Sequence, residues 1–258
     1  MKCSELTGIL ERLAPTEYAC EWDNVGLLAG DGECEIHTVY VALDATDEVI
    51  EEAVRGKADL LITHHPLIFG GIRRVAADDF IGRRIWKLAR HNISYYAMHT
   101  NFDVCVMADL AAERLGLTDT EVLEETGTWN GKPCGIGKMG AFEGTLENCA
   151  AFVKERFYIS DVKLFGDLEH RVRKLAISPG SGKSEIAHAV SKGADVLITG
   201  DIDHHSGIDA VAQGLCIIDA GHYGLEHIFV EYMAEYLRRM NPELTVLTRE
   251  QIPPFVIV

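Results

Sequence analysis

"VYVALDATDEVIEEAVRGKADLLITHH" (residues 39–65) contains the pattern that predicts the fold. It begins and ends with short runs of aliphatic residues, as strands buried on both faces do. Thr46 can cap a helix between these runs, and the acids that follow it suit the positive end of the helix dipole. The inward face of this helix is formed by Val49, Ile50, Ala53 and Val54. A strand, a helix and a second strand in this order indicate an α/β fold.

The same alternation of strands and helices continues through the rest of the chain. We expect a helix over residues 80–91, a strand over 93–99 and a helix near 108–116. The pattern then restarts with a strand near 137–143, a helix over 146–157 capped by Thr145, and a strand over 173–179. A chain of 258 residues can bury a substantial core in one large domain or in two small ones.

The restart is also visible in the residues themselves. With a constant offset of 136, residues 39–65 align without a gap on "LAISPGSGKSEIAHAVSKGADVLITGD" (residues 175–201). The strands "ADLLIT" and "ADVLIT" carry most of the match. We therefore predict two related α/β lobes from an internal duplication, with lobe one at residues 1–127 and lobe two at residues 128–258.

Side chains that bind metals concentrate in four short segments, three of which directly follow a predicted strand. These segments are His64 and His65, "MHTNFD" (98–103), "GDIDHH" (200–205) and "DAGHYGLEH" (219–227). The carboxyl ends of strands are where open α/β sheets bind ligands. A single histidine at a strand end is more often a polar residue bonded to backbone, but four such segments favour a metal site. Imidazole and carboxylate without cysteine suit Zn, Mn, Fe, Co or Ni.

The spacing within these segments favours two metal ions over one. His64 and His65 are adjacent on an extended chain and point to opposite sides, so a single ion would not reach both. His222 and Glu226 lie one helical turn apart, where their donor atoms can meet. A carboxylate can bridge two cations about 3.5–4 Å apart, and we assign this role to Glu226. His37, His91 and His170 lack such a context and are interpreted as surface residues, and His188 as structural.

Composition excludes several other classes of protein. Forty acids against 24 bases give a net charge of -16, which disfavours nucleic acid and anionic membranes as partners and favours metal cations. The seven cysteines are scattered and form no C-x-x-C pair, so we expect reduced thiols that mostly fill the core. No apolar run reaches the length of a membrane span, and acids occur too early for a signal peptide. We therefore expect a soluble, cytoplasmic protein.

Two further stretches have competing interpretations. "ISPGSGKSEI" (177–186) resembles a phosphate loop, but the first glycine of that motif falls on Ile177, so only a looser anion contact from its glycine-rich turn stays open. "EWDNVGLLAG" (21–30) reads as a turn in which Asp23 or Asn24 bonds to nearby backbone, and we expect Trp22 to pack rather than contact a ligand.

Together these stretches resemble a known family. "EWDNVGLLAG", "ALDAT", "ADLLITHHPLIF", "AMHTNFD", "ADVLITGD" and "DAGHYGLEHIFVE" occur in the order typical of the Nif-three-like family, also called the GTP cyclohydrolase 1 type 2 family. The resemblance covers nearly the whole chain. It implies two related α/β lobes with a dinuclear metal site in the cleft between them, and assembly into a toroidal homohexamer.

The resemblance also implies which residues hold the two divalent cations. One cation would be bound by His64 and Asp103, the other by His65 and His222, and both by the bridging Glu226. This bridging role agrees with the one assigned from spacing.

Two functional hypotheses follow. In the first, the protein is a hydrolase whose metals activate water, with His99 or His205 as the base that moves the proton. The family name implies GTP, by opening of its purine ring, as the small-molecule substrate; other nucleotides or phosphoesters suit the same chemistry. In the second, the metals stabilise a toroidal scaffold that binds a partner without turnover.

Overall fold

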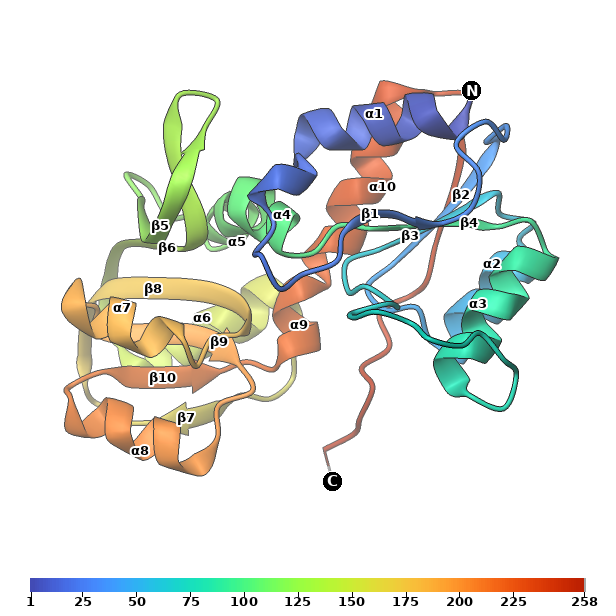
Figure 1. The fold of residues 1–258 in the computed structure, drawn as a ribbon. Helices are drawn as coiled ribbons and strands as arrows, with labels where there is room; N and C mark the ends of the chain where they lie inside the picture. Colours follow the sequence, from blue (N-terminus) through green and yellow to red (C-terminus); the bar gives the residue numbers. More distant parts are fainter. Residues whose placement is uncertain (258) are drawn as a thin grey trace. The chain divides into compact units, whose positions relative to one another are not determined.

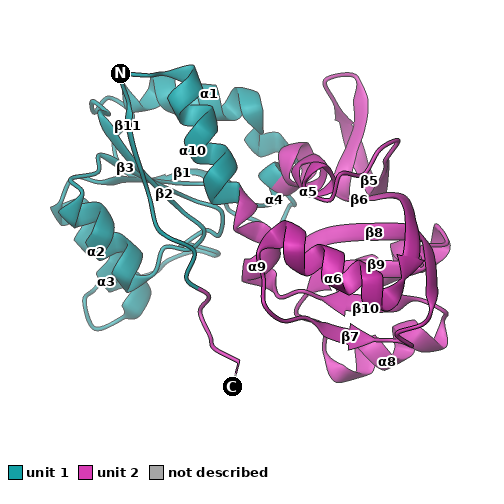
Figure 2. Cartoon of the chain, turned by 180° about the vertical axis from the view of Figure 1, so that it is seen from behind, with its two compact units in different colours: residues 1–102, 229–252 teal, residues 103–228, 253–258 magenta. Residues whose placement is uncertain are grey.

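The computed structural model describes residues 1–257, which form two compact units (Figure 2). Unit 1 consists of Met1–Phe102 and Phe229–Ile252, and unit 2 of Asp103–Ile228 together with the residues from Pro253 onward. The chain thus leaves unit 1 after Phe102, returns to it at Phe229 and leaves it again after Ile252. The predicted lobes, residues 1–127 and 128–258, differ from these units because they divide the chain a single time.

Unit 1 contains a five-stranded sheet in the order β1-β4-β3-β2-β11 (Figure 1). The strands are β1 (Gly26–Ala29), β2 (Thr38–Ala42), β3 (Leu60–Thr63), β4 (Ser94–Ala97) and β11 (Thr245–Thr248). All neighbours are parallel except β1, which runs antiparallel to β4. The last strand joins the edge at β2, which explains why the chain returns to this unit.

Helices cover both faces of this sheet, so its central strands are buried on both sides. The helices of the unit are α1 (Cys3–Leu13), η1 (Thr16–Tyr18), α2 (Asp47–Arg55), α3 (Phe80–Arg90), α4 (Thr100–Phe102) and α10 (Ile228–Met240). Figure 1 shows α2 and α3 on one face, with α1 and α10 on the other. As predicted, Thr46 caps α2, and its hydroxyl accepts from the Val49 N–H at 3.2 Å.

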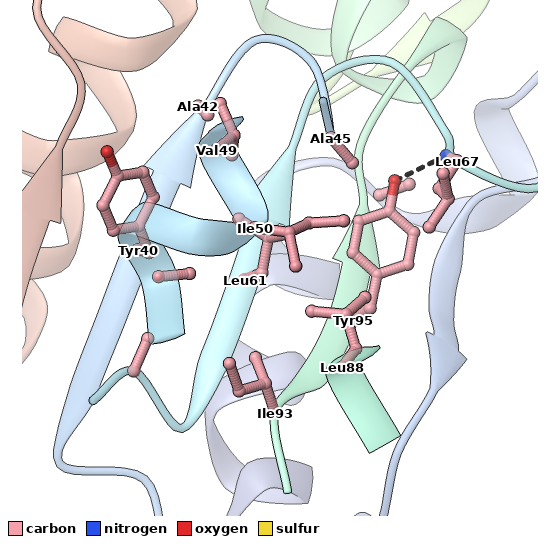
Figure 3. Packing of buried hydrophobic residues seen from close by; sticks show 13 residues of the cluster. Tyr40, Ala42, Ala45, Val49, Ile50, Leu61, Leu67, Leu88, Ile93 and Tyr95 are labelled. Carbon is pink, nitrogen blue, oxygen red and sulfur yellow. Dashed lines mark hydrogen bonds between the residues drawn. The ribbon is translucent and has the colours of Figure 1, made fainter. Parts of the chain in front are cut away.

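The core between the sheet and α2 and α3 is drawn in Figure 3. Val49 and Ile50 of α2 and Leu88 of α3 pack against Leu61 and Tyr95 of the sheet. Burial of each large aliphatic side chain contributes about 1.5–3 kcal/mol before entropy is counted. The core also satisfies its polar atoms, since the Tyr95 hydroxyl accepts from the Leu67 N–H at 2.7 Å and fixes the loop after β3.

Unit 2 contains a six-stranded sheet in the order β5-β6-β8-β9-β10-β7. The strands are β5 (Glu121–Trp129), β6 (Lys132–Thr145), β7 (Lys163–Phe165), β8 (Arg171–Ser181), β9 (Val196–Gly200) and β10 (Cys216–Asp219). Only β8, β9 and β10 are parallel to one another, and the remaining pairs are antiparallel. The fold is therefore mixed α/β, with a parallel centre in each sheet.

The helical elements of unit 2 are η2 (Asp103–Met107), α5 (Ala108–Arg114), α6 (Leu146–Phe157), α7 (Glu185–Ser191), α8 (His204–Ala212) and α9 (His222–Glu226). Thr145 caps α6 as predicted, through a reciprocal pair of bonds with Asn148. Residues of α7 and α8 pack on the sheet around Leu197 and Ile217. Among the described residues, no helix is long and apolar enough to span a membrane.

The two units share one local hydrogen-bonding pattern at the predicted offset. Asp59 Oδ2 accepts two bonds of 2.8 Å from consecutive backbone N–H groups at the start of β2. Asp195 Oδ2 accepts bonds of 2.7 and 2.9 Å from consecutive N–H groups of β8. Asp59 and Asp195 are aligned residues in the sequence comparison, so the alignment relates like positions. Descent of the units from one duplicated ancestor stays a prediction.

Candidate metal centre

Unit 1 gathers three of the predicted histidines at the carboxyl ends of two neighbouring strands. His64 and His65 directly follow β3, and His99 lies just after β4, which pairs with β3 in parallel. The three side chains offer ring nitrogens within 4.8 Å of one another. His64 is fully buried, whereas His65 and His99 are partly exposed. The expected convergence of strand ends therefore occurs within this unit.

Hydrogen bonds fix the orientation of the first two rings. His64 Nδ1 lies 2.8 Å from the carbonyl oxygen of Met98, and His65 Nδ1 lies 2.8 Å from Asp44 Oδ1. A carbonyl or an ionised carboxylate only accepts, so Nδ1 carries the hydrogen and Nε2 keeps its lone pair in the neutral ring. This is the arrangement found behind metal-binding histidines. Asp44 was not assigned a site role from the sequence, although it follows β2 at the same edge.

His99 is held by a buried carboxylate. Its Nδ1 lies 3.0 Å from Asp23 Oδ1, and Asp23 Oδ2 accepts from the N–H and hydroxyl of Thr100 at 3.0 and 2.6 Å. Burial acts to raise the pKa of Asp23, but the bonds from His99 and Thr100 outweigh it and hold that pKa well below its usual range. Asp23 is therefore a fixed anion at neutral pH. It can hold the His99 ring in one orientation.

The predicted packing role of Trp22 is wrong. Its side chain is 65% exposed, and its indole meets the His99 ring edge-on, with centroids 5.9 Å apart. The turn itself is as expected, because Asp23 Oδ1 accepts from the Asn24 N–H at 2.8 Å. The bond from Asn24 to Asp23 fixes the backbone of the turn, and the Trp22 indole lies outside the core.

Unit 2 brings together the remaining predicted ligands around Glu226. His222 Nε2 and Glu226 Oε2 lie 2.9 Å apart on α9, one helical turn from each other as predicted. The Glu226 side chain is only 4% exposed. Asp103, at the start of η2, offers a carboxylate oxygen within 4.8 Å of one on Glu226. His222 Nδ1 is bound by Asp201 Oδ2 at 2.7 Å, so its Nε2 faces the buried carboxylate.

Space for the Glu226 carboxylate depends on Gly180. A Cβ built at Gly180 would lie 2.5 Å from Glu226 Oε1 and 3.9 Å from His222 Nε2. Gly180 also has a positive φ of +82°, which disfavours any other residue. The glycine-rich turn that resembled a phosphate loop thus leaves room for a carboxylate. The lysine of that motif, Lys183, instead pairs with Asp203 Oδ2 at 2.9 Å.

Other predicted residues lie elsewhere. His205 is exposed in the first turn of α8, where its ring contacts that of His204, and its catalytic role stays a prediction. Asp219 pairs with Lys163 at 2.7 Å. His37 and His91 are exposed as predicted, but Nε2 of His170 is buried, so this side chain is not a simple surface residue. 

The donor set fits a transition-metal ion. Four histidines, His64, His65, His99 and His222, each have Nδ1 bound by an oxygen acceptor, so Nε2 is the ring nitrogen that would serve as a metal ligand. The carboxylates of the buried Glu226 and the partly exposed Asp103 supply negative charge. Imidazole with carboxylate is the donor combination that Zn and other first-row metals accept. The groups of described residues that could hold a metal ion contain no cysteine, so thiolates need not be invoked.

Comparison with known proteins gives a consistent result. The family model described as Duf34/NIF3 (NGG1p interacting factor 3) matches residues 1–253. A Clostridium acetobutylicum protein named GTP cyclohydrolase 1 type 2 homolog is 33% identical over 92% of this chain and 90% of its own length. A Streptococcus pneumoniae protein of the same name is 36% identical over 94% of this chain and 92% of its own.

Solved structures are similar over the full chain. A Bacillus cereus protein related to NIF3 has a TM-score of 0.91 at 25% identity, covering 100% of this chain and 99% of that one. A hypothetical protein of Staphylococcus aureus has a TM-score of 0.90 at 31% identity, with the same coverage.

Proposed function

The chain belongs to the Duf34/NIF3 family, and from this membership and the site geometry we propose that it is a hydrolase that uses two divalent metal cations. The observation that carries the proposal is the shared orientation of four histidines, each with Nδ1 bound by an oxygen acceptor, so that Nε2 is the ring nitrogen that would bind a metal. Histidines with a purely structural role would not need to share this arrangement at four positions. The buried Glu226 carboxylate, with space kept by Gly180, supports the same conclusion.

We propose the ligands of each cation from the family resemblance. Unit 1 offers three imidazoles whose ligand atoms lie together, and unit 2 offers one imidazole with two carboxylates. A dinuclear hydrolytic centre needs a bridging carboxylate, and the family resemblance gives this role to Glu226. In this proposal one cation is held by His64 and Asp103, and the other by His65 and His222.

The chemistry is hydrolysis at a carbon or phosphorus centre. When bound, two such cations provide a nucleophile at neutral pH and polarise a substrate oxygen. His99 is the residue best placed to move a proton, because the Asp23 carboxylate fixes the orientation of its ring. Asp44 and Asp201 hold the rings of His65 and His222 in position. His205 lacks such an anchoring contact, so we assign the proton transfer to His99.

The names of the relatives suggest the substrate class. Because the Clostridium and Streptococcus proteins are named GTP cyclohydrolase 1 type 2 homolog, we propose a purine nucleotide, with GTP as the first compound to test. The reaction would add water to the purine ring and open it. Homohexamer formation is a further prediction from the family resemblance, and light scattering of the purified protein tests it. A cytoplasmic location is a prediction from the sequence pattern.

The test combines metal analysis with turnover. Wild type should hold about two transition-metal ions per chain after reconstitution. It should also convert GTP to a ring-opened product, which chromatography measures. Glu226→Gln should abolish turnover, whereas Glu235→Gln, an exposed glutamate on α10, should leave it unchanged. Full activity in Glu226→Gln would refute the hydrolase. Metal loss that lowers melting temperature or assembly, with no turnover of any nucleotide by wild type, would favour the metal-stabilised scaffold.

A further inference from the structure

A second cluster of metal-ligand side chains lies in unit 2, on elements that contribute nothing to the centre described above. Glu124 lies on β5, and Glu185 and His188 lie three residues apart on α7, where they share a helix face. Each offers one ligand atom, and the three atoms lie within 4.8 Å of one another. His188 Nε2 and Glu124 Oε1 are 3.6 Å apart. No local sequence pattern connects these residues, because β5 and α7 are far apart along the chain.

Glu185 distinguishes this cluster from an ordinary group of surface acids. The residue is only 3% exposed, and its Oε2 is buried without a hydrogen-bond partner. Burial raises the pKa of the Glu185 carboxyl, and the negative charge of Glu124 raises it further, against smaller opposing effects of Ser184 and His188. Buried carboxylate oxygens are nearly always satisfied, so this one requires a specific explanation.

A nearby lysine does not supply the missing positive charge. Lys192, at the end of α7, donates to the carbonyl oxygen of Val122 at 2.6 Å. Its ammonium group is therefore engaged by β5 backbone. The remaining charge partner of Glu185 is His188, whose side chain is 42% exposed.

We propose that Glu124, Glu185 and His188 bind one divalent transition-metal cation, with water completing its coordination. Two ligands about 2.1 Å from a tetrahedral ion lie about 3.4 Å apart, close to the separation of His188 and Glu124. Two carboxylates and an imidazole form a donor set that Zn and Co accept. The side chains of Glu124 and His188 are 35% and 42% exposed, so an ion and its water ligands can reach the buried Glu185 from solvent.

The test uses Co²⁺ as the probe in full-length, metal-stripped protein. In a His65→Ala, His222→Ala background, which weakens the dinuclear centre, we expect about one Co²⁺ per chain by equilibrium dialysis, with visible absorption typical of low coordination number. Adding His188→Ala should weaken this binding at least about tenfold. His188 is partly exposed, so its loss should leave the fold intact, and circular dichroism checks this. Glu185→Gln, of equal size, should give the same loss.

A matched pair of β5 variants controls for charge alone. Glu124→Gln should weaken Co²⁺ binding, whereas Glu125→Gln should not, because neighbouring residues of a strand face opposite sides. Each substitution removes one negative charge. No residual Co²⁺ in the background variant, or binding unaffected by His188→Ala and Glu185→Gln, would overturn the proposal. In that case, a proton shared between Glu124 and Glu185 would explain why these two carboxyl groups lie close together. This outcome is independent of GTP turnover.

Discussion

Replacing Gly180 by alanine would place a methyl group against the Glu226 carboxylate. The new Cβ would lie 2.5 Å from Glu226 Oε1, whereas ordinary contact begins near 3.4 Å. The carboxylate would have to move by about 0.9 Å to relieve the clash. Metal–oxygen bonds are about 2.0–2.2 Å long and tolerate changes of about 0.2 Å. Because Glu226 is buried and has little room, this displacement should break a metal bond.

The substitution also has a conformational cost that must be measured separately. A Cβ at positive φ costs about 1–2 kcal/mol, whatever surrounds it. Gly214 provides the matched control, because it lies in the same unit, has a φ of +87°, and a Cβ there would meet nothing within 4 Å. Gly214→Ala should therefore lower the free energy of unfolding of the metal-free protein by the conformational cost alone, and Gly180→Ala by that cost together with the cost of displacing the Glu226 carboxylate.

The two variants should differ once metal is added. We expect Gly180→Ala to weaken metal binding about 10- to 100-fold, equivalent to about 1.4–2.7 kcal/mol, as loss of positioning around a ligand does. Gly214→Ala should bind metal like wild type. Urea denaturation of the stripped proteins and metal titration of the folded proteins measure the two effects. Equal metal affinity in the two variants would refute a ligand role for Glu226.

Three more predictions follow from individual contacts. Asp44→Ala should weaken metal binding about 10- to 100-fold in a metal titration, because His65 loses the acceptor that orients it; unchanged affinity would exclude His65 as a ligand. Asp23→Asn should lower the free energy of unfolding by about 2–3 kcal/mol at pH 7. Folding depresses the pKa of Asp23, so its stabilisation is present above the unfolded value of about 3.9 and is lost as pH falls toward the folded one. Urea denaturation should thus show the two proteins converging below about pH 4, and a pH-independent difference would contradict this. Thr145→Ala should cost about 1 kcal/mol in the same assay by removing the cap of α6, and no loss would show that the cap is redundant.

Local features of the fold could be predicted because their causes lie within a few residues. The caps at Thr46 and Thr145 depend on side chains three positions apart, and both form as expected. The strand over residues 59–63 was visible because a strand covered on both faces is a continuous apolar run. The convergence of His64 and His99 followed from parallel pairing of adjacent strands, which brings their carboxyl ends together.

Features that depend on distant contacts could not be predicted. Pairing of β11 with β2 places the end of the chain at the edge of the first sheet, and no local pattern names that partner. Nothing in the sequence distinguishes Asp44 from the other acids, and only its bond to His65 in the structure indicates its role. Gly180 belongs to a motif that suggested phosphate binding, and only the position of Glu226 shows what the missing side chain makes room for.

The aligned strand ends of the two units explain how one framework can supply different ligands. His65 of unit 1 aligns with Asp201 of unit 2, and each follows a parallel strand in its own sheet. His65 offers its own Nε2, whereas Asp201 accepts from His222 Nδ1 at 2.7 Å and orients that ring instead. Gly200, aligned with His64, permits this arrangement, since a Cβ there would lie 2.5 Å from the His222 backbone nitrogen. An imidazole at position 200 would exclude α9 from its place. The same strand end therefore supplies a ligand in one unit and the support for a ligand in the other.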